Sequence, residues 1–397
     1  MIVVAVASGT SADGLDVGVA DLRWDGDGGV VLDLRASFTE PWPEGVREAV
    51  LGLLPPATTT AMDLCAVDTA VGQAVGQAAR RASERYAAGA ADLVVSPGQT
   101  VAHDVRDGRC HGTLQVGQPA WVVQATGLPV VSDLRARDVA DGGHGAPLAS
   151  TLDSLWLSGP GGPRAALNLG GIANVTVLGA PGQPVLAWDT GPANCLLDVA
   201  AARVTGGRER YDAGGRLAAA GTVRPDLLDL LLAHPYFAQR PPCSTGRETF
   251  SESFLDDCLA GLPAVGPADL LATLTELTAV TVARALAPYG VTEVVASGGG
   301  VENPALMAAL ARRLGGTRLV TSDERGLPAR AKEVAMWALL GFLTWHGLPG
   351  TVGATGSATP RVLGRITPGD RPLRLPEPAT AMPRRLLVSS RAAEVVR

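Results

Sequence analysis

The feature that most constrains the fold is a succession of short segments that occurs twice along the chain. Residues 1 to 40 hold three apolar, alternating segments separated by the polar turns SGTSADG and WDGDGG, a pattern that predicts three strands joined as hairpins. The same opening returns over residues 164 to 192, and each opening is followed by alternating helical and strand patterns. Two α/β halves of similar organisation favour an internal duplication, although no identity between their sequences is visible.

Helices are predicted wherever apolar residues recur at helical spacing. They cover residues 44–54, 61–88, 249–261, 268–288, 304–314 and 331–346. Strands are predicted for the apolar runs in ADLVVSPGQT, EVVASGGG and TRLVTS, and GTLQVGQPAWVVQATGLPVVSD is interpreted as strand, helix and strand. A chain of 397 residues with this alternation suggests two domains rather than one.

Charge, hydropathy and cysteine content exclude several classes of protein. The net charge is −6 without a basic block, so no nucleic-acid partner is expected. The apolar N-terminal run is short and ends in a polar turn, and no apolar stretch is long enough to cross a bilayer, so no membrane partner is expected. The five cysteines are scattered without a CxxC pair, which argues against disulfides and structural zinc. A cytoplasmic protein is predicted.

Four polar, glycine-rich turns adjoin apolar strands. They are SGTSADGLD (8–16), NLGGIAN (168–174), DTGPAN (189–194) and SGGGVENP (297–304). Each turn alone is consistent with an ordinary chain reversal. In open α/β folds, however, ligands bind at the carboxyl ends of strands, and four such turns together predict a nucleotide site.

The first of these turns illustrates the two interpretations. Glycines in the loop from Gly9 to Gly14 would let backbone N–H groups approach a phosphate, with Thr10 and Ser11 as hydroxyl donors. Asp13 or Asp16 would then hold a magnesium ion, directly or through bound water. The alternative is a plain hairpin turn. No GK[ST] and no helix follow the loop, so it is not a Walker loop.

On these and further motifs the chain resembles the anhydro-N-acetylmuramic acid kinase family, part of the actin-like, sugar-kinase and Hsp70-like superfamily. The motifs run in order from residue 8 to about 340 and include SGTSADGLD, GQTVAH, DLRARDVADGGHGAPL, NLGGIANVT, DTGPANCLLD, YDAGG, HPYF, STGRETF, SGGGVENP and AKEVAMWALL. The resemblance implies two actin-like (RNase H-like) α/β lobes with a central cleft for ATP and substrate.

The residue pattern and the resemblance together give the expected domain boundaries. Residues 1–134 would form lobe I, rejoined by about 348–372 as the resemblance implies, and residues 135–347 would form lobe II. The Pro- and Arg-rich stretch 373–397 would be a C-terminal tail, either loose or a docking segment. The resemblance also implies the reaction. The implied reaction uses ATP and Mg²⁺. Water opens the 1,6-anhydro ring of anhydro-N-acetylmuramic acid and the freed 6-oxygen receives the phosphate, giving N-acetylmuramic acid 6-phosphate during cell-wall recycling. The implied partners are a small anhydro-sugar and a second copy of the chain in a homodimer.

Asp189, in DTGPAN, matches the catalytic base of the family. A reaction that deprotonates water needs one well-placed carboxylate, and Asp189 follows an apolar segment beside a glycine turn. The alternative from the residues alone is that Asp189 caps the helix that begins near Pro192. The resemblance favours the base.

Residues in the other three turns match the ATP contacts of the family. Gly9 to Asp16 match the phosphate loop. The remaining matches are Asn168, Gly170 and Gly171 in a second phosphate turn, and Gly298, Gly299, Gly300 and Asn303 beside the adenosine. The alternative for Asn303 is a plain helix cap before Pro304.

For the sugar, the candidates are Thr100, Arg135 and Glu333. A guanidinium at Arg135 would suit the lactyl carboxylate through a bidentate pair, and an internal salt bridge to Asp133 or Asp138 is the alternative. Glu333 would accept sugar hydroxyls or, alternatively, pair with a neighbouring base on a solvated helix face.

Three positions depart from the pattern expected of the family. Pro97 stands where a histidine is expected before GQT, Cys243 replaces a lysine before STGRE, and Arg330 occupies a place that is often acidic. All three lie in motifs on the sugar side. The alternative functions are therefore a kinase for a bare anhydro-sugar such as levoglucosan or, in another class, a non-catalytic protein that binds nucleotide or sugar.

Overall fold

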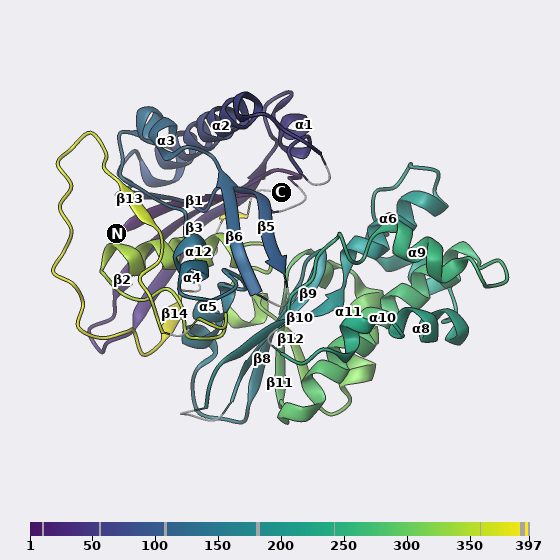
Figure 1. Cartoon of the computed structure of the whole chain (residues 1–397). Helices are drawn as coiled ribbons and strands as arrows, with labels where there is room; N and C mark the ends of the chain where they lie inside the picture. The colour runs from purple at the N-terminus through teal and green to yellow at the C-terminus, as the bar shows by residue number, and fades with distance from the viewer. Residues whose placement is uncertain are drawn as a thin grey trace. The chain divides into compact units, whose positions relative to one another are not determined.

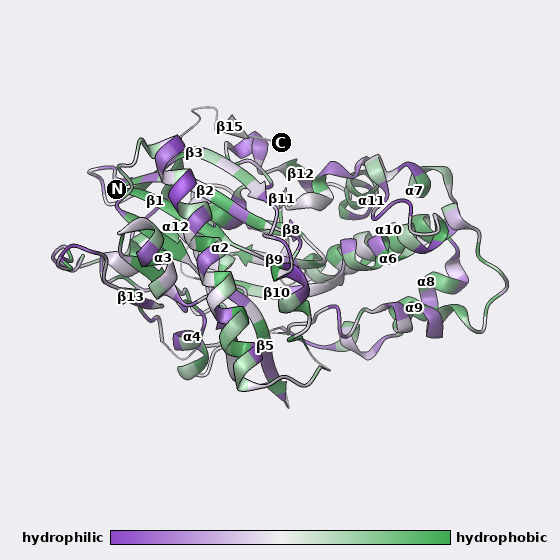
Figure 2. Ribbon diagram, turned by 90° about the horizontal axis from the view of Figure 1, so that it is seen from above, coloured by the Kyte–Doolittle hydropathy of each residue, from purple (hydrophilic) through white to green (hydrophobic). Residues whose placement is uncertain are grey.

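The first predicted opening folds as an antiparallel meander inside a mixed sheet. β1 (Ile2–Ala7), β2 (Leu15–Trp24) and β3 (Val30–Glu40) are joined as hairpins. β1 also pairs in parallel with β4 (Leu93–Ser96), and β4 pairs in parallel with β7 (Val130–Ser132). Figure 2 shows β1 and β2 mainly in the hydrophobic colour, because successive residues are buried on both faces of the sheet.

The second opening folds the same way. β8 (Arg164–Leu169), β9 (Ile172–Leu178) and β10 (Leu186–Pro192) form antiparallel hairpins, and β8 pairs in parallel with β11 (Glu293–Ser297), which pairs in parallel with β12 (Arg318–Thr321). The strand order β10-β9-β8-β11-β12 repeats the order β3-β2-β1-β4-β7 of the first sheet. The expected class, two α/β lobes of actin-like topology, is confirmed, and the repeated order supports the duplication.

The computed structural model describes residues 1–9, 12–54, 57–106, 109–179, 183–241, 243–357, 359–389 and 394–395. The chain divides into two units, the first made of Met1–Ser158 with Ala331–Arg397 and the second of Gly159–Arg330. These boundaries differ from the expected 134/135 and 347/348. The residues from 135 to 158 and the helix after 331 belong to the first unit, because they pack on its sheet and its C-terminal segments.

Helices cover both faces of the first sheet. Its helices are α1 (Val46–Leu51), α2 (Ala61–Ala87), α3 (Pro119–Thr126), α4 (Ala136–Ala140), α5 (Ala149–Leu157) and α12 (Lys332–Trp345). α2 shares a core with Val17 and Val19, whereas α12 reaches the opposite face, where a Cβ on Gly18 would lie 2.6 Å from Val334. Figure 1 shows α12, in green to yellow, against the purple N-terminal strands.

The C-terminal segment is docked on the first unit. β13 (Arg365–Thr367) pairs antiparallel to β7, and β14 (Leu386–Val388) and β15 (Glu394–Val395) pair in parallel with β3. The stretch from 373 onward is therefore the docking segment that was one of its two interpretations, because it extends the sheet. A separate hairpin of β5 (Gln99–Arg106) and β6 (Arg109–Val116) follows β4.

The second unit surrounds one long helix, α10 (Pro267–Leu286). The other helices are α6 (Asn194–Val204), α7 (Arg216–Ala220), α8 (Pro225–Leu232), α9 (Glu252–Leu259) and α11 (Pro304–Leu314), with the short 3₁₀ turns η1 (Ala213–Gly215), η2 (Pro235–Ala238), η3 (Ala287–Tyr289), η4 (Gly299–Glu302) and η5 (Asp323–Arg325). Pro267–Tyr289 is long and apolar enough to cross a membrane, but 78% of its most apolar window is buried inside the protein, as in the core helix of a folded unit.

Candidate active site

In the first unit, the loop between β1 and β2 is held by hydrogen bonds from both sides. The amide of Ala12 donates to the Gly9 carbonyl at 3.0 Å, and Ala12 has a φ of 51°. The Arg47 guanidinium, on α1, donates to the Ala12 carbonyl at 3.0 Å and forms an ion pair with exposed Asp13 at 3.3 Å. Thr10 and Ser11, predicted to contact phosphate, lie outside the described residues.

Gly14 and Asp16 close this loop against β3. A Cβ on Gly14 would lie 2.7 Å from the Thr39 methyl and 2.9 Å from the Glu40 carbonyl, so the close approach of the two strands requires glycine. The Asp16 carboxylate accepts a hydrogen bond from the Thr39 hydroxyl at 2.6 Å. The carboxylate is thereby fixed at the start of β2, beside the loop.

Gln99 joins this loop to the strand that carries Thr100, a contact that the sequence did not predict. Its side chain is 1% exposed, and its amide nitrogen donates to the Gly9 and Thr100 carbonyls, both at 3.2 Å. The Thr100 hydroxyl in turn accepts from the Gln115 amide at 3.2 Å. The GQT motif was the available signal, because a polar residue that closely follows an apolar strand needs partners when it is buried.

Arg135 lies just before α4 and makes neither of the salt bridges that were its alternative. Its guanidinium donates to the Gly145 carbonyl at 2.8 Å and lies 5.2 Å from the centre of the Trp337 ring. Asp133 instead faces Arg365, and buried Asp138 accepts from the Gly145 amide. Burial lowers the pKa of Arg135, while a nearby carboxylate, Glu333, opposes that shift.

Glu333 lies in the first turn of α12. The residue as a whole is exposed, but loss of water around its carboxyl group raises its pKa above the ordinary value, and the charge of Asp16 adds to the rise. Arg135 and a hydrogen bond from Trp337 oppose this rise. The neighbouring base does not pair with Glu333, because Lys332 is buried and forms an ion pair with Asp153 at 2.7 Å. Three residues predicted to contact ATP, metal or sugar, Asp16, Arg135 and Glu333, therefore lie together in the first unit.

In the second unit, Asp189 is held by hydrogen bonds to both its backbone and its side chain. The Tyr236 hydroxyl donates to the Asp189 carbonyl at 2.6 Å, and the Asp189 amide donates to the Cys243 carbonyl at 3.0 Å. The Thr245 amide donates to one carboxylate oxygen at 2.9 Å. Asp189 does not cap α6, because that helix begins at Asn194 without a side-chain cap. The HPYF and STGRE motifs thus form the support of Asp189.

Burial raises the pKa of Asp189 to about 7, the charge of Glu248 adds to the rise, and the bond from Thr245 opposes it. The Cys243 thiol lies 3.6 Å from the Tyr236 hydroxyl, and burial raises the pKa of this thiol, so it stays neutral. A carboxylate that titrates near neutral pH is suited to take and release a proton.

Two of the predicted turns in the second unit, NLGGIAN and SGGGVENP, touch each other. Ser297, the last residue of β11, pairs with Asn168 at the end of β8. Gly298 has a φ of 86°, and a Cβ there would lie 2.8 Å from the Asn168 side-chain oxygen. A Cβ on Gly300 would lie 2.6 Å from Leu169. Glycine is therefore required at both positions by close approach, and Gly299 faces open space.

The DTGPAN turn joins the same group. The Asn194 amide donates to the Gly170 carbonyl at 3.0 Å and the Ala193 amide donates to the Gly171 carbonyl at 2.9 Å. Three of the four predicted turns are thus in direct contact within the second unit, at the carboxyl ends of β8 and β11, where α/β folds bind ligands.

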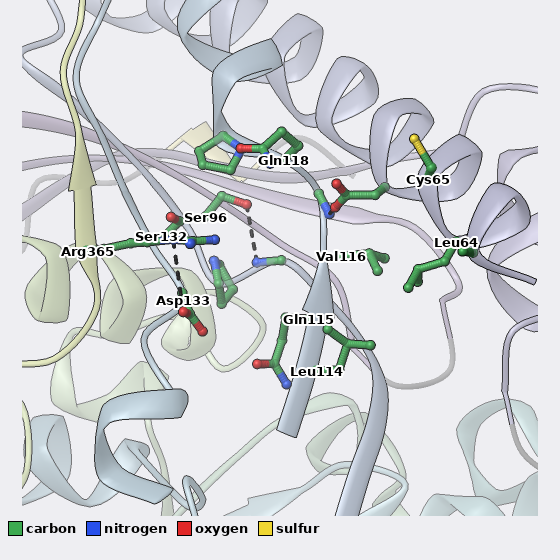
Figure 3. Close-up of a pocket in the computed structure, with 16 residues that line it drawn as sticks. Leu64, Cys65, Ser96, Leu114, Gln115, Val116, Gln118, Ser132, Asp133 and Arg365 are labelled. Carbon is green, nitrogen blue, oxygen red and sulfur yellow. Dashed lines mark hydrogen bonds and ion pairs between the residues drawn. The ribbon is translucent and has the colours of Figure 1, made fainter. Parts of the chain in front are cut away.

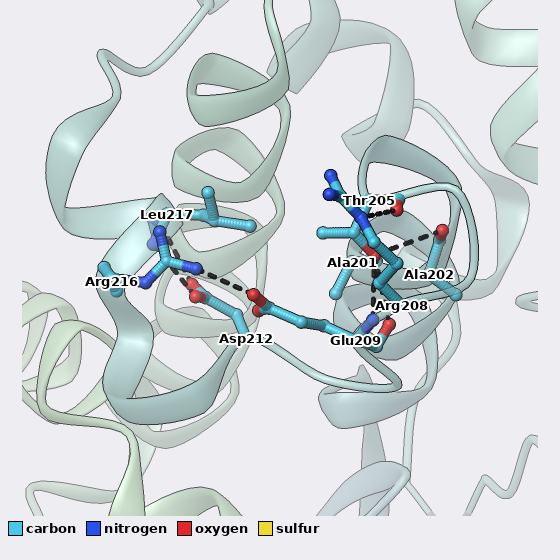
Figure 4. Close-up of polar contacts among 9 residues, drawn as sticks. Ala201, Ala202, Thr205, Arg208, Glu209, Asp212, Arg216 and Leu217 are labelled. Atoms are coloured by element: carbon cyan, nitrogen blue, oxygen red, sulfur yellow. Dashed lines mark hydrogen bonds and ion pairs between the residues drawn. The ribbon is translucent and has the colours of Figure 1, made fainter.

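Asn303 caps α11, which was the alternative interpretation of this residue. Its side-chain oxygen accepts from the Leu306 amide at 3.1 Å, which leaves the donors of its amide nitrogen for a ligand. The YDAGG motif supports this cap, because Gly215 packs directly on the Asn303 oxygen. Figure 4 shows Asp212 of that motif facing the start of α7, where it accepts from the Leu217 and Ala218 amides, each at 2.9 Å.

The motifs can now be compared with known proteins. A model of the anhydro-N-acetylmuramic acid kinase family matches residues 1–369. A protein with that family's name from Streptomyces coelicolor is 51% identical over 98% of this chain and 99% of its own length. The chain belongs to the anhydro-N-acetylmuramic acid kinase family. It is therefore a kinase, a phosphotransferase that acts on an alcohol group.

Other known proteins are similar to this anhydro-N-acetylmuramic acid kinase family member. A relative with the same name from Rhodococcus erythropolis is 47% identical over 94% of this chain and 96% of its own length. Among solved structures, a ROK family glucokinase from Streptomyces griseus in complex with glucose and AMPPNP is 15% identical over 86% of this chain and 99% of that chain, with a TM-score of 0.39.

The family implies a magnesium ion, and the residues present fit one. Among the described residues no group of three or more His, Cys, Asp or Glu gathers as a closed metal site. Asp13 and Asp16 lie on one hairpin beside the loop, and Mg²⁺ on a nucleotide usually takes one or two carboxylates together with phosphate oxygens and water. Carboxylate oxygens are the donor type that such an ion takes from a protein.

One departure from the family pattern has a structural explanation. The Arg330 guanidinium forms a two-bond ion pair with Glu302 of η4 in the second unit. This pair connects the segment before Ala331 to the turn predicted to lie beside the adenosine. Both side chains are more than half exposed, so the pair contributes little stability by itself.

Proposed function

We propose that this kinase uses ATP and water to convert anhydro-N-acetylmuramic acid into N-acetylmuramic acid 6-phosphate. The observation that carries the proposal is Asp189, a carboxylate held by Tyr236, Cys243 and Thr245, with a pKa of about 7. The same substrate appears in the printed names of the curated relatives.

In the proposed reaction, Asp189 takes a proton from the water that attacks the anomeric carbon. The bond between that carbon and the 6-oxygen breaks, and the 6-oxygen forms a new bond to the γ-phosphorus of ATP, releasing ADP. One carboxylate oxygen of Asp189 is engaged by the Thr245 amide, which leaves the other to face the water. Positioning of these groups, rather than a covalent intermediate on the protein, lowers the barrier.

The nucleotide would be held by the glycine turns. The loop from Gly9 to Asp16 would hold phosphate through its amides, and Asn168, Gly170 and Gly171 would form the second phosphate turn. Gly298 to Gly300 would lie against the nucleoside. Asp13 and Asp16 would hold Mg²⁺, which neutralises phosphate charge when bound.

The sugar would be bound by Thr100, Arg135 and Glu333. Arg135 remains charged despite its lowered pKa and can pair with the lactyl carboxylate, because its fork of donors is only partly used by Gly145. Glu333 can accept sugar hydroxyls. We further propose that the protein acts in the cytoplasm, a reducing compartment that agrees with its five free cysteines. We also propose that it forms a homodimer.

The test is ADP release with purified protein, ATP and magnesium, offering anhydro-N-acetylmuramic acid and levoglucosan separately. We expect turnover of the first to be faster. Faster turnover of levoglucosan would mean that the departures at Pro97 or Cys243 have changed the preferred sugar. No turnover with either sugar would refute the proposal.

The role of Asp189 is tested with Asp189→Asn. General-base catalysis contributes about 10²- to 10⁴-fold, so turnover should fall by that factor while ATP binding by calorimetry is unchanged. Asp229→Asn, an exposed position on α8, is the matched control and should keep the wild-type rate. A near wild-type rate for Asp189→Asn would contradict the assignment.

A further inference from the structure

A pocket of about 370 Å³ opens in the first unit between α2, the β5–β6 hairpin and the ends of β4, β7 and β13. Ser96 and Ser132 are the last residues of two neighbouring parallel strands, and Ser132 pairs across the sheet with Arg365. The pocket therefore lies at the carboxyl ends of parallel strands, the edge where α/β sheets bind ligands. Its volume falls within the range of about 300–1,000 Å³ that is usual for ligand sites.

The two sides of the pocket differ in chemistry. Figure 3 shows Ser96, Ser132, Asp133 and Arg365 on one side, and the apolar side chains of Leu64, Leu114 and Val116 on the other. Leu114 is 43% exposed, so this apolar side is open to a ligand. A ring with polar groups along its edge and an apolar face matches this arrangement.

Two buried polar atoms of the pocket have no hydrogen-bond partner among the described residues. Ser132 is 5% exposed, and its hydroxyl is unpartnered. The side-chain oxygen of Gln115 is also buried without a partner, although its nitrogen donates to Thr100 and Thr113. Buried polar groups are nearly always paired, so these two atoms are placed to receive hydroxyl donors.

Asp133 adds a carboxylate in an uncommon conformation. Its φ is 55°, in the left-handed region that residues other than glycine rarely adopt and that often marks functional sites. The nearest guanidinium nitrogen of Arg365 lies 4.0 Å from the carboxylate, longer than a hydrogen-bonded pair. Both groups thus keep hydrogen-bonding capacity toward the pocket.

The pocket adjoins the residues assigned to the sugar without containing them. Its lining includes none of Asp16, Thr100, Arg135 and Glu333, although Pro97 and Gly98, which precede Thr100 in the sugar-side motif, do line it. Gln115 lines the pocket and also holds the Thr100 hydroxyl, so one side chain connects the two places.

We propose that this pocket is a second saccharide site, which binds a neutral pyranose such as an N-acetylhexosamine. Ring hydroxyls donate to Gln115, Asp133 and Ser132, Arg365 donates to ligand oxygens, and Leu114 packs on the apolar face of the ring. Acceptors in excess on the polar side and an apolar platform opposite are the chemistry that recognises a sugar rather than an anion.

The experiment is saturation-transfer difference NMR on the full chain with N-acetylglucosamine and with glucose as probes, at millimolar concentrations. Binding is expected for N-acetylglucosamine, and it should persist when AMPPNP and excess anhydro-N-acetylmuramic acid are present. Leu114→Asp places a charge on the exposed apolar side and should abolish the signal. The double variant Ser132→Ala with Asp133→Asn should weaken binding at least tenfold, since asparagine tolerates a positive φ.

Asp104→Asn, on β5 outside the pocket lining, is the matched control and should bind like the wild type. The proposal is overturned if neither probe binds, if excess anhydro-sugar removes the signal, or if Leu114→Asp binds normally. Because the readout is binding mapped by variants, it stands apart from the kinase assay, and failure of one does not imply failure of the other.

Discussion

The raised pKa of Asp189 predicts that the carboxylate proposed as the catalytic base destabilises the folded protein at neutral pH. The pKa rises from 3.8 to about 7 on folding, because the charged form is buried. At about 1.36 kcal/mol per pKa unit, the shift corresponds to about 4 kcal/mol. Since the folded pKa is the higher one, the contribution of the protonated carboxyl group to stability is fully present below pH 3.8. It is lost as the pH rises through about 7, where the carboxyl group of the folded protein loses its proton.

Asp189→Asn removes this pH dependence. Asparagine keeps an oxygen that accepts from the Thr245 amide but carries no charge at any pH. The free energy of unfolding of the variant should therefore exceed that of the wild type by an amount that grows with pH, by about 4 kcal/mol between pH 4 and pH 8. Most of this growth should occur below pH 7.

The assay is urea unfolding at several pH values, followed by tryptophan fluorescence, with Asp229→Asn as control. Trp188 is buried next to Asp189 in the second unit and reports on that unit. The wild-type kcat/KM should show an acid limb near pH 7, because only the deprotonated base is active. A stability difference that is constant with pH, or a variant less stable than the wild type at pH 8, would refute the reasoning.

Three further predictions concern residues that support the site. Gln99→Ala should reduce the coupling between ATP binding and sugar binding, because the Gln99 side-chain amide joins Gly9 to the strand of Thr100. Calorimetric titrations with ATP, with and without sugar, measure this coupling. Unchanged coupling would contradict the role of Gln99. Tyr236→Phe removes one bond to Asp189 and should cost about 1 kcal/mol of stability and lower kcat while the KM for ATP is kept, as steady-state kinetics would show. Lys332→Met leaves the Asp153 charge buried and should cost about 3–5 kcal/mol in urea unfolding, whereas a loss under about 1 kcal/mol would mean that the carboxylate is solvated.

Local patterns predicted the elements well because helix and strand periodicity are properties of short segments. The three-strand openings and the helices at 61–88 and 304–314 are confirmed within a residue or two by α2 and α11. The polar turns were also visible, since glycine and asparagine at strand ends are local signals. Asp16, Arg135 and Glu333 could be named from motifs, although not their proximity.

Contacts between distant segments decided the rest. α12 joins the first sheet because Gly18 and Val334 fit together across more than 300 residues of chain, and β14 joins β3 over a similar separation. No local pattern records such pairings, which is why the observed unit boundaries differ from the expected ones. The support of Asp189 by Tyr236 and Thr245 was hidden for the same reason.

The sequence by itself determined which residues are candidates for the chemistry: the carboxylate of Asp189, the glycine turns and the charged groups near the first strands. Only the tertiary structure decided how those groups behave. The pKa of Asp189 depends on burial and on Glu248, and the partner of Lys332 is Asp153 rather than the adjacent Glu333. Residue type sets which proton or hydrogen bond is available, but burial and neighbouring charge, which arise from long-range packing, set its energy.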